Sequence, residues 1–199
     1  MSDHYFSTDP SSAFTTTPMT DTVWGHEVTL QTASGVFARG RLDIGTAALF
    51  QETQPPAAGE AFLDLGCGYG IIALALALAR PAAVVWAVDV NERALELTRR
   101  NAETLGLGER VRPRLPEQVP EGVRFDGLWS NPPIRVGKTE LHAMLLHWLP
   151  RLQPGGEAVM VVGKNLGADS LQRWLGEHRF PTERLASTKG FRVLRSTRD

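Results

Sequence analysis

The sequence of 199 residues predicts an α/β fold with a mostly parallel sheet flanked by helices, and three observations support this prediction. From residue 61 onward, short apolar runs alternate with helical stretches, as in strand-helix-strand units. A glycine-rich turn, residues 64–70, joins the first apolar run to the first helical stretch. A chain of this length can bury one substantial core, so we expect a single main domain over residues 60–199.

Strands are expected where apolar residues form short runs, and helices where good helix formers follow capping residues. The expected strands lie near residues 61–65, 83–88, 110–114, 125–130 and 157–162. The expected helices lie near residues 70–79, 91–105, 139–152 and 169–178. The chain closes with an expected antiparallel hairpin over residues 182–196, which turns at Lys189 and Gly190.

The segment 71–79 could be mistaken for a strand, because its leucines alternate with alanines at a period of two. Ala and Leu are strong helix formers, and the segment directly follows the glycine turn, so we expect a helix. In the next helix, Asn91 is the expected N-terminal cap, and Gly106 is the expected left-handed residue that ends it.

The part of the chain before the main domain divides into two segments. Residues 1–21 are rich in Ser, Thr and Pro without a hydrophobic period, which predicts a flexible arm. Residues 22–59 predict a small β-rich N-terminal extension that packs on the main domain. It holds a hairpin around residues 25–26, a third extended piece, a short helix over residues 45–51 and a linker at residues 55–59.

The composition limits the class of protein. Basic and acidic residues nearly balance, 21 against 22, so any contact with nucleic acid must come from local patches. The last 21 residues hold six basic and two acidic side chains, which indicates either a phosphate-binding track or a solvated sheet edge. Cys67 is the single cysteine, so an internal disulfide and a multi-cysteine zinc site are excluded, and we expect no metal. The polar, acidic start and a longest apolar run of nine residues predict a cytoplasmic protein without a membrane segment.

The glycine-rich turn is the first element that indicates a ligand. Gly66, Gly68 and Gly70 follow a strand and precede a helix, so the backbone can bend tightly and present N–H groups to a polar molecule. The dinucleotide fingerprint needs its third glycine three residues after the second, where this chain has Ile71. The spacing favours a cofactor without a pyrophosphate and disfavours a nicotinamide dehydrogenase.

Two carboxylates at strand ends match the two ends of S-adenosylmethionine. Asp64 ends the first strand and can receive the cationic amino group of a bound amino acid. Asp89 ends the second strand, 19 residues beyond Gly70, near the offset of about 20 residues at which an acidic residue meets ribose in related folds. The simpler alternatives are a surface carboxylate at position 64 and, at position 89, a cap or turn residue before Asn91.

A motif with two prolines, which follows a later strand, indicates the type of reaction. Asn131-Pro132-Pro133-Ile134 follows the apolar run 125–130. The Asn131 side-chain oxygen and the Pro132 carbonyl can accept the two hydrogens of an exocyclic amine, which directs the nitrogen lone pair toward a methylsulfonium. The prolines restrict the backbone, so both acceptors are held in place. Alone, this motif is typical of an ordinary loop; combined with the glycine turn, it predicts methyl transfer to a planar nitrogen.

These segments resemble the Rossmann-like class I S-adenosylmethionine-dependent methyltransferases, and specifically the small-domain group that includes bacterial small-subunit ribosomal RNA guanine-N2 methyltransferases. The likeness rests on residues 64–70, Asp89, residues 131–138 and residues 189–194, and segments 34–37 and 43–46 look like the part that closes the cofactor pocket. The cofactor-binding residues that it implies are Phe37, Thr46, Asp64, Gly66, Cys67, Gly68, Gly70, Asp89, Val90 and Asn131, and the catalytic ones are Asn131, Pro132, Pro133 and Ile134.

The chain departs from the family pattern in two places. The larger ribosomal enzymes carry a degenerate copy of the domain before the catalytic one, where this chain has about sixty residues. Many relatives that methylate exocyclic amines place Phe or Tyr after the two prolines, where it can stack on a flipped base, whereas this chain has Ile134. Phe37 is the candidate for that stacking.

The resemblance predicts an enzyme that moves a methyl group from S-adenosylmethionine to guanine N2 in ribosomal RNA, either naked or in a small-subunit particle. One rival is an N-methyltransferase acting on a protein glutamine or on DNA adenine, since both present a planar amide or amine. Another rival is a cofactor-binding, RNA-associated protein without turnover. The sequence gives no oligomeric state.

Overall fold

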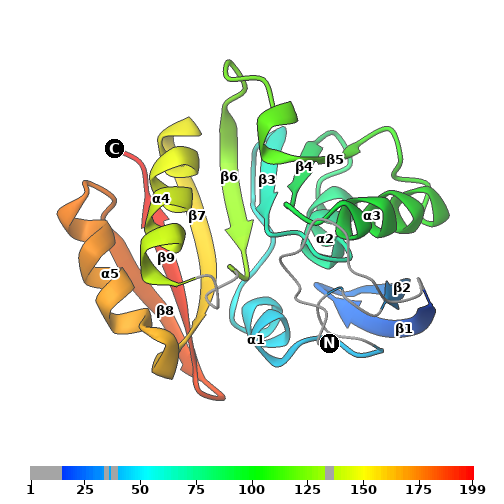
Figure 1. Cartoon of the computed structure of the whole chain (residues 1–199), viewed down its shortest axis with the longest axis horizontal. Coiled ribbons are helices and arrows are strands. Elements are labelled where there is room, and N and C mark those ends of the chain that lie inside the picture. Colours follow the sequence, from blue (N-terminus) through cyan, green and yellow to red (C-terminus); the bar gives the residue numbers. More distant parts are fainter. Residues whose placement is uncertain (1–14, 34–35, 37–39, 133–136) are drawn as a thin grey trace.

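The computed structural model describes residues 15–33, 36, 40–132 and 137–199. Its largest element is a seven-stranded sheet with the strand order β5-β4-β3-β6-β7-β9-β8 (Figure 1). The parallel strands are β3 (Ala61–Leu65), β4 (Val84–Val88), β5 (Val111–Arg114), β6 (Phe125–Ser130) and β7 (Leu152–Gly163). The sheet confirms the predicted α/β class.

The last two strands form the predicted C-terminal hairpin. β9 (Phe191–Thr197) pairs antiparallel with β7, and β8 (Thr182–Thr188) pairs antiparallel with β9. The chain proceeds from β3 to β4 and β5 on one side and then returns to β6 on the other side of β3. Strand order therefore reverses between β3 and β6, and ligands of such sheets bind at the carboxyl ends of the strands beside that reversal.

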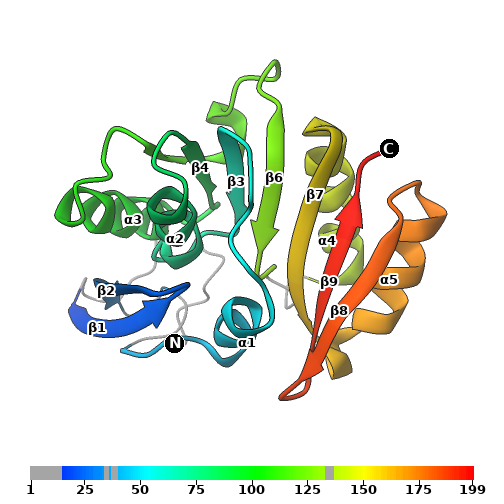
Figure 2. The ribbon, with the colours of Figure 1, turned by 180° about the vertical axis from the view of Figure 1, so that it is seen from behind.

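Helices cover both faces of the sheet (Figure 2). α1 (Ile44–Glu52), α2 (Ile71–Ala79) and α3 (Glu92–Thr104) share one hydrophobic cluster with one face. α4 (Lys138–Trp148) and α5 (Ala168–Glu177) share a second cluster with the other face. α2 is buried from Ile71 to Ala77, which explains its almost wholly apolar sequence and confirms the helix. Within the described part of the chain, no helix is long and apolar enough to cross a lipid bilayer.

The cap predictions for α3 are confirmed. The Asn91 side chain accepts a hydrogen bond from the Arg93 N–H at 3.0 Å, so it satisfies one free donor of the first turn. The helix ends before Gly106, whose φ of +69° is the left-handed conformation expected there. Three short 3-10 segments complete the helical elements of the described chain: η1 (Pro116–Gln118), η3 (Leu149–Arg151) and η4 (Lys164–Leu166).

The N-terminal hairpin is longer than predicted. β1 (Thr16–Val23) pairs with β2 (His26–Ala33) in a separate two-stranded sheet, with Trp24 and Gly25 at φ +46° and +82° in the turn. Residues 16–21, expected in the flexible arm, therefore belong to a strand. Thr and Pro conceal the alternation there, although Met19 and Val23 are buried. The expected third extended piece falls mainly on residues 37–39, outside the described residues.

Two boundaries near β7 also differ from the prediction. The helix expected to reach residue 152 ends at Trp148 and continues as η3, because Pro150 has no N–H to donate to the preceding turn. β7 begins at Leu152 and not near residue 157. Phe125 pairs with Leu152 and Gly127 with Glu157, so the segment Pro154-Gly155-Gly156, which lies between the expected helix and the expected strand, is a bulge within β7.

Candidate active site

The carboxyl ends of β3, β4 and β6 meet at the glycine-rich turn (Figure 1). The Gly66 and Cys67 N–H groups donate to the Val88 carbonyl at 2.8 and 3.0 Å, which ties the turn after β3 to the end of β4. The Ser130 hydroxyl donates to the Leu65 carbonyl at 2.6 Å, which ties the end of β6 to the same turn. The predicted residues that follow these three strands are therefore brought to one edge of the sheet.

The turn itself needs its glycines. Gly66, Gly68 and Gly70 have φ values of +76°, +57° and +89°, a region that side chains other than glycine rarely adopt. A Cβ atom on Gly70 would also lie 2.7 Å from Thr98 Cγ2, too close for any real contact. The Thr98 hydroxyl donates to the Gly68 carbonyl at 3.1 Å and holds the turn against α3.

Asp64 is fully buried beneath the turn. One carboxylate oxygen accepts a hydrogen bond from the Ala73 N–H at 2.9 Å, and the other is buried without a partner among the described residues. Burial raises the pKa of Asp64 to about 8, against the Ala73 hydrogen bond, which lowers it, and with a further increase from the charge of Asp89. An unpaired buried acceptor of this kind fits a site that receives a cationic group.

Asp89 lies at the end of β4 and is 4% exposed. Its carboxylate accepts hydrogen bonds from the Gly68 N–H at 2.9 Å and from the Asn91 N–H at 3.0 Å. The side chain is thus held in a fixed orientation beside the glycine-rich turn. Val90 follows with 44% of its surface exposed, which places an apolar side chain at the same edge.

Asn131 immediately follows β6, and its amide group is held from one side. Its Nδ2 donates to Asp43 Oδ2 at 2.8 Å and to Thr46 Oγ1 at 3.0 Å. Among the described residues, none donates to its Oδ1. Both amide hydrogens are therefore used inside the protein, and the oxygen, at the other end of the planar amide group, points away from Asp43 and Thr46.

The other predicted site residues divide into two groups. Pro132 lies among the described residues and is buried, so the first two residues of the motif, Asn131 and Pro132, are packed in the protein. Phe37, Pro133 and Ile134 lie outside the described residues, and their predicted roles stay predictions.

Cys67 is a packed residue within the turn. Its thiol is buried, 3.7 Å from the Thr98 hydroxyl. Burial, reinforced by the charges of Asp89 and Asp64, holds the pKa of the Cys67 thiol well above its ordinary value. The thiol stays protonated at neutral pH, and since the thiolate is the nucleophilic form, Cys67 is unsuited to covalent catalysis.

Asp43 was expected only as part of the segment 43–46 that closes the cofactor pocket, and the structure adds a direct contact between Asp43 and Asn131. Its carboxylate accepts a hydrogen bond from the Thr46 N–H at 3.0 Å and caps α1, besides holding Asn131. An Asp before a helix is a recognisable capping signal, but a contact across 88 residues leaves no local pattern.

Asn101 was also missed, and it connects the N-terminal hairpin to the glycine turn. Its Nδ2 donates to the Gln31 and Tyr69 carbonyls, each at 2.9 Å, and its Oδ1 accepts from the Gln31 N–H at 2.8 Å. Asn101 lies in the last turn of α3, within the helix, where asparagine is a weaker helix former than alanine or leucine. That mismatch is the one signal in the sequence that could have drawn attention to it.

The arginines of the C-terminal hairpin are engaged in ion pairs. Arg184 pairs with Asp169 at 2.5 Å, and Arg195 pairs with Glu157 at 3.5 Å and with Glu183. Arg192 lies 3.6 Å from Asp169. These contacts favour the solvated-edge interpretation of the basic C-terminus over a phosphate-binding track.

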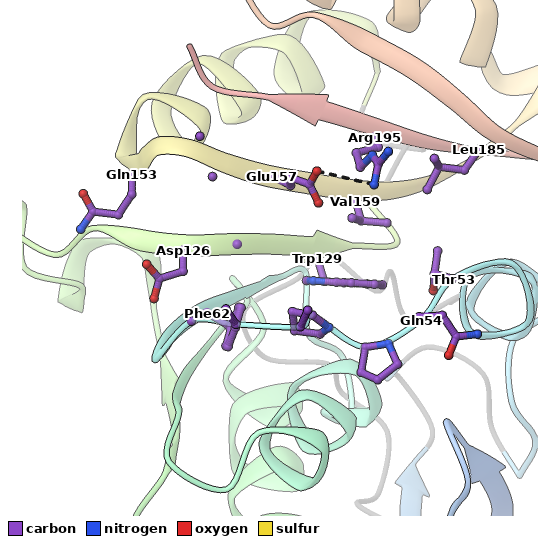
Figure 3. A pocket seen from close by; sticks show the side chains of 18 of the residues that line it. Thr53, Gln54, Phe62, Asp126, Trp129, Gln153, Glu157, Val159, Leu185 and Arg195 are labelled. Atoms are coloured by element: carbon purple, nitrogen blue, oxygen red, sulfur yellow. Dashed lines mark ion pairs between the residues drawn. The ribbon is translucent and has the colours of Figure 1, made fainter.

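A separate groove of about 740 Å³ runs along the sheet face beside residues 53–59, which include the linker at residues 55–59 (Figure 3). Asp126 and Gln153 lie toward one end of it and Leu185 toward the other, and Glu157 faces Arg195 across an ion pair. The groove contains none of the predicted site residues. Its lining comes largely from the linker and the first residues of β3, β6 and β7, so we separate it from the site at the carboxyl ends.

In the described part of the chain, no three His, Cys, Asp or Glu side chains are grouped to hold a metal ion.

Comparison with known proteins places this geometry in a family. The methyltransferase small domain family matches residues 27–195. The uncharacterized protein YbxB of Bacillus subtilis is 32% identical over 198 residues, which cover 98% of each chain. Ribosomal RNA small subunit methyltransferase C of Klebsiella pneumoniae is 33% identical over 88% of this chain and 52% of its own length.

Among solved structures, the Thermus thermophilus 16S rRNA N2 methyltransferase RsmC, in complex with AdoMet and guanosine, superposes with a TM-score of 0.80. It is 24% identical, covering 96% of this chain and 52% of that chain, so it confirms the fold. The chain thus spans about half the length of the relatives named ribosomal RNA small subunit methyltransferase C. The match over most of the sequence shows that the chain belongs to the methyltransferase small domain family and is an S-adenosylmethionine-dependent methyltransferase.

Proposed function

We propose that the protein methylates an exocyclic amine of a nucleobase, and that its target is guanine N2 in ribosomal RNA. The observation that carries this proposal is the orientation of the Asn131 amide, whose two hydrogens bind Asp43 and Thr46. The remaining group is an acceptor oxygen, which suits a substrate that brings N–H donors. A hydroxyl, thiol or carbon substrate has no pair of N–H groups and would not need two acceptors, the Asn131 oxygen and the Pro132 carbonyl.

The residues around the proposed cofactor pocket fit S-adenosylmethionine. The unpaired oxygen of Asp64 would receive its amino group, and Asp89 would accept hydrogen bonds from its ribose. The exposed side chain of Val90 offers an apolar surface for its adenine. The glycine-rich turn lets the backbone approach the bound molecule without a Cβ atom in the way.

The acceptors would act on the target amine directly. An exocyclic amine on a base is a weak nucleophile because its lone pair is delocalised into the ring. Hydrogen bonds from the two amine hydrogens to Asn131 Oδ1 and the Pro132 carbonyl would favour a pyramidal nitrogen with a localised lone pair. When bound, S-adenosylmethionine supplies an electrophilic methyl group. Preorganised polar groups of this kind contribute about 3 to 4 kcal/mol each to the barrier.

The relatives support ribosomal RNA as the substrate. Several proteins named ribosomal RNA small subunit methyltransferase C are 33 to 35% identical over 85 to 88% of this chain. The structurally similar Thermus thermophilus enzyme is described as an N2 methyltransferase and was solved with guanosine. This chain spans about half of those proteins, so the modified nucleotide can differ from theirs.

The proposal is tested by mapping methyl groups in cells with and without the protein. We expect one ribosomal N2-methylguanosine to disappear from the deletion strain and to return with the wild-type gene. In parallel, labelled S-adenosylmethionine is incubated with purified protein and with RNA, protein and DNA fractions from the deletion strain. Label in glutamine or in DNA adenine would replace the proposal with its first rival. A protein that forms no S-adenosylhomocysteine with any fraction would contradict enzymatic function.

The burial of Asp64 gives the cofactor site a pH dependence. In the free protein, the pKa of Asp64 is raised from 3.8 to about 8, so the carboxyl is largely protonated at pH 6.5. A bound ammonium group would favour the carboxylate, so binding should release up to one proton. Affinity for S-adenosylmethionine should rise with pH between 5.5 and 7, by at most about tenfold per unit.

The raised pKa of Asp64 makes the ligand-free protein less stable as the pH rises, whereas it makes cofactor binding stronger. A carboxyl group whose pKa rises on folding destabilises the folded state once it is charged. The contribution of Asp64 to the free energy of unfolding is therefore greatest below about pH 4. Between pH 4 and pH 8 this contribution should fall by up to about 1.4 kcal/mol for each pH unit. Titration calorimetry at pH 6.5 in buffers of different ionisation heat measures the proton release. If the binding heat of the wild type does not depend on the buffer, no proton is released and the role of Asp64 is refuted. The same role is refuted if the binding heat of Asp64→Asn still depends on the buffer.

A further inference from the structure

We propose that Asp43 is a positioning residue that fixes which end of the Asn131 amide faces the substrate; this inference rests on the proposed function. An asparagine amide can occupy nearly the same space in two orientations that exchange its oxygen and nitrogen. Only the orientation with the oxygen toward the substrate offers an acceptor to an amine. The protein therefore needs a group that distinguishes the two ends.

Asp43 is such a group, because an ionised carboxylate accepts hydrogen bonds and donates none. It lies 2.8 Å from Asn131 Nδ2, a distance typical of a hydrogen bond to a charged acceptor. Turning the amide over would place the Asn131 oxygen against the carboxylate and lose this bond. Thr46 adds a second contact at 3.0 Å but does not discriminate alone, since its hydroxyl can donate or accept.

The position of Asp43 is itself determined by α1. Its carboxylate accepts the Thr46 N–H at 3.0 Å, so the same oxygen caps the helix and binds Asn131. The helix is packed closely on the C-terminal hairpin, because a Cβ on Gly45 would lie 3.0 Å from the Phe191 ring. Thr46 is 4% exposed. The N-terminal extension therefore supplies part of the active-site geometry, and does so from a helix that has little freedom to move.

The decisive variant is Asp43→Ser. Serine caps helices as well as aspartate does, so α1 should be retained. Its hydroxyl can donate or accept, so positions 43 and 46 would then no longer distinguish the two ends of the Asn131 amide. An inverted Asn131 would present N–H groups to an amine that also offers only N–H groups. We expect the methyl-transfer rate constant to fall by about threefold or more, with the dissociation constant for S-adenosylmethionine changing less than about threefold.

A second substitution separates orientation from general damage. In the double variant Asp43→Ser with Asn131→Asp, the hydroxyls at positions 43 and 46 can both donate to one oxygen at position 131. The other oxygen of the new carboxylate is then free to accept from the substrate amine, whichever way the group is turned. We expect the double variant to be at least about twofold faster than Asp43→Ser. A purely structural role for Asp43 predicts no such recovery, because the second change adds a further disturbance.

The assay measures single-turnover methyl transfer to small-subunit ribosomal RNA from the deletion strain, with melting temperature and cofactor affinity for each variant. Asp169→Asn is the matched control, since Asp169 is an exposed carboxylate in the first turn of α5, and its rate should stay within twofold of wild type. Full activity of Asp43→Ser beside an inactive Asn131→Ala would overturn the positioning role alone, as would a double variant no faster than Asp43→Ser. Full activity of Asn131→Ala would instead overturn the proposed function.

Discussion

Replacing Asn131 with alanine is expected to lower the rate constant of methyl transfer by about a hundredfold or more, with nearly unchanged affinity for S-adenosylmethionine. The substitution removes the oxygen that would hold one amine hydrogen, and loss of a single preorganised group of this kind typically costs about 3 to 4 kcal/mol. Cofactor affinity should change little, because Asp64 and the glycine turn do not depend on Asn131. Single-turnover transfer of labelled methyl to RNA measures the first quantity, and calorimetry measures the second.

Asn165→Ala is the control for this experiment. Asn165 follows β7, the strand beside β6, and lies exposed in η4 without a role in the proposed chemistry. Its removal should leave the rate within about twofold of wild type. A normal rate for Asn131→Ala with normal cofactor binding would mean that the amine is not held by this amide.

Replacing Asp89 with alanine is expected to weaken S-adenosylmethionine binding by about tenfold to a hundredfold. A hydrogen bond to a charged acceptor contributes about 1.5 to 3 kcal/mol, which corresponds to this range. The Gly68 and Asn91 N–H groups, now bound to the Asp89 carboxylate, would also lose their acceptor. The glycine-rich turn would then be less well ordered for any ligand. Equilibrium binding of the cofactor is the measurement.

Asp126→Ala separates the loss of a ligand contact from the loss of backbone support. The Asp126 carboxylate likewise accepts two backbone N–H groups, those of Glu60 and Ala61, at 2.7 and 3.0 Å. It does so at the start of β3, at the opposite end from the proposed pocket. This variant should lower the melting temperature without weakening cofactor binding. If both variants weaken binding equally, Asp89 acts through stability and not through the ribose.

The elements that the sequence predicted well are those whose signals are local. β3 lies between Glu60 and Gly66 and β6 lies between Arg124 and Asn131, and these polar or glycine neighbours allowed the bounds of both strands to be predicted to the residue. The predictions for β1 and β7 were too short, because both strands contain residues that ordinarily interrupt a strand. Pro18 lies in β1, which has only one partner strand, and Pro154 lies in a bulge of β7.

The candidate site was predictable to the extent that its residues follow strands. Because parallel strands end at one edge, Asp64, Asp89 and Asn131 could be placed together without coordinates. The orientation of Asn131 could not, since it depends on Asp43, which is brought near by the docking of α1. Likewise, the fold reveals that one oxygen of Asp64 is buried without a partner among the residues that the structure describes, because the sequence carries no measure of burial at a strand end.

The contact that Asn101 makes with Gln31 and Tyr69 has a consequence for how the protein responds to its ligand. Because one amide group bridges the second strand and the turn, separating the N-terminal hairpin would remove the two hydrogen bonds to Gln31 that help to hold the Asn101 amide against the Tyr69 carbonyl. We therefore expect occupancy of the pocket to slow the opening of the hairpin. The backbone proton of Gln31, which is bound to Asn101, reports on this linkage by its rate of exchange with deuterium.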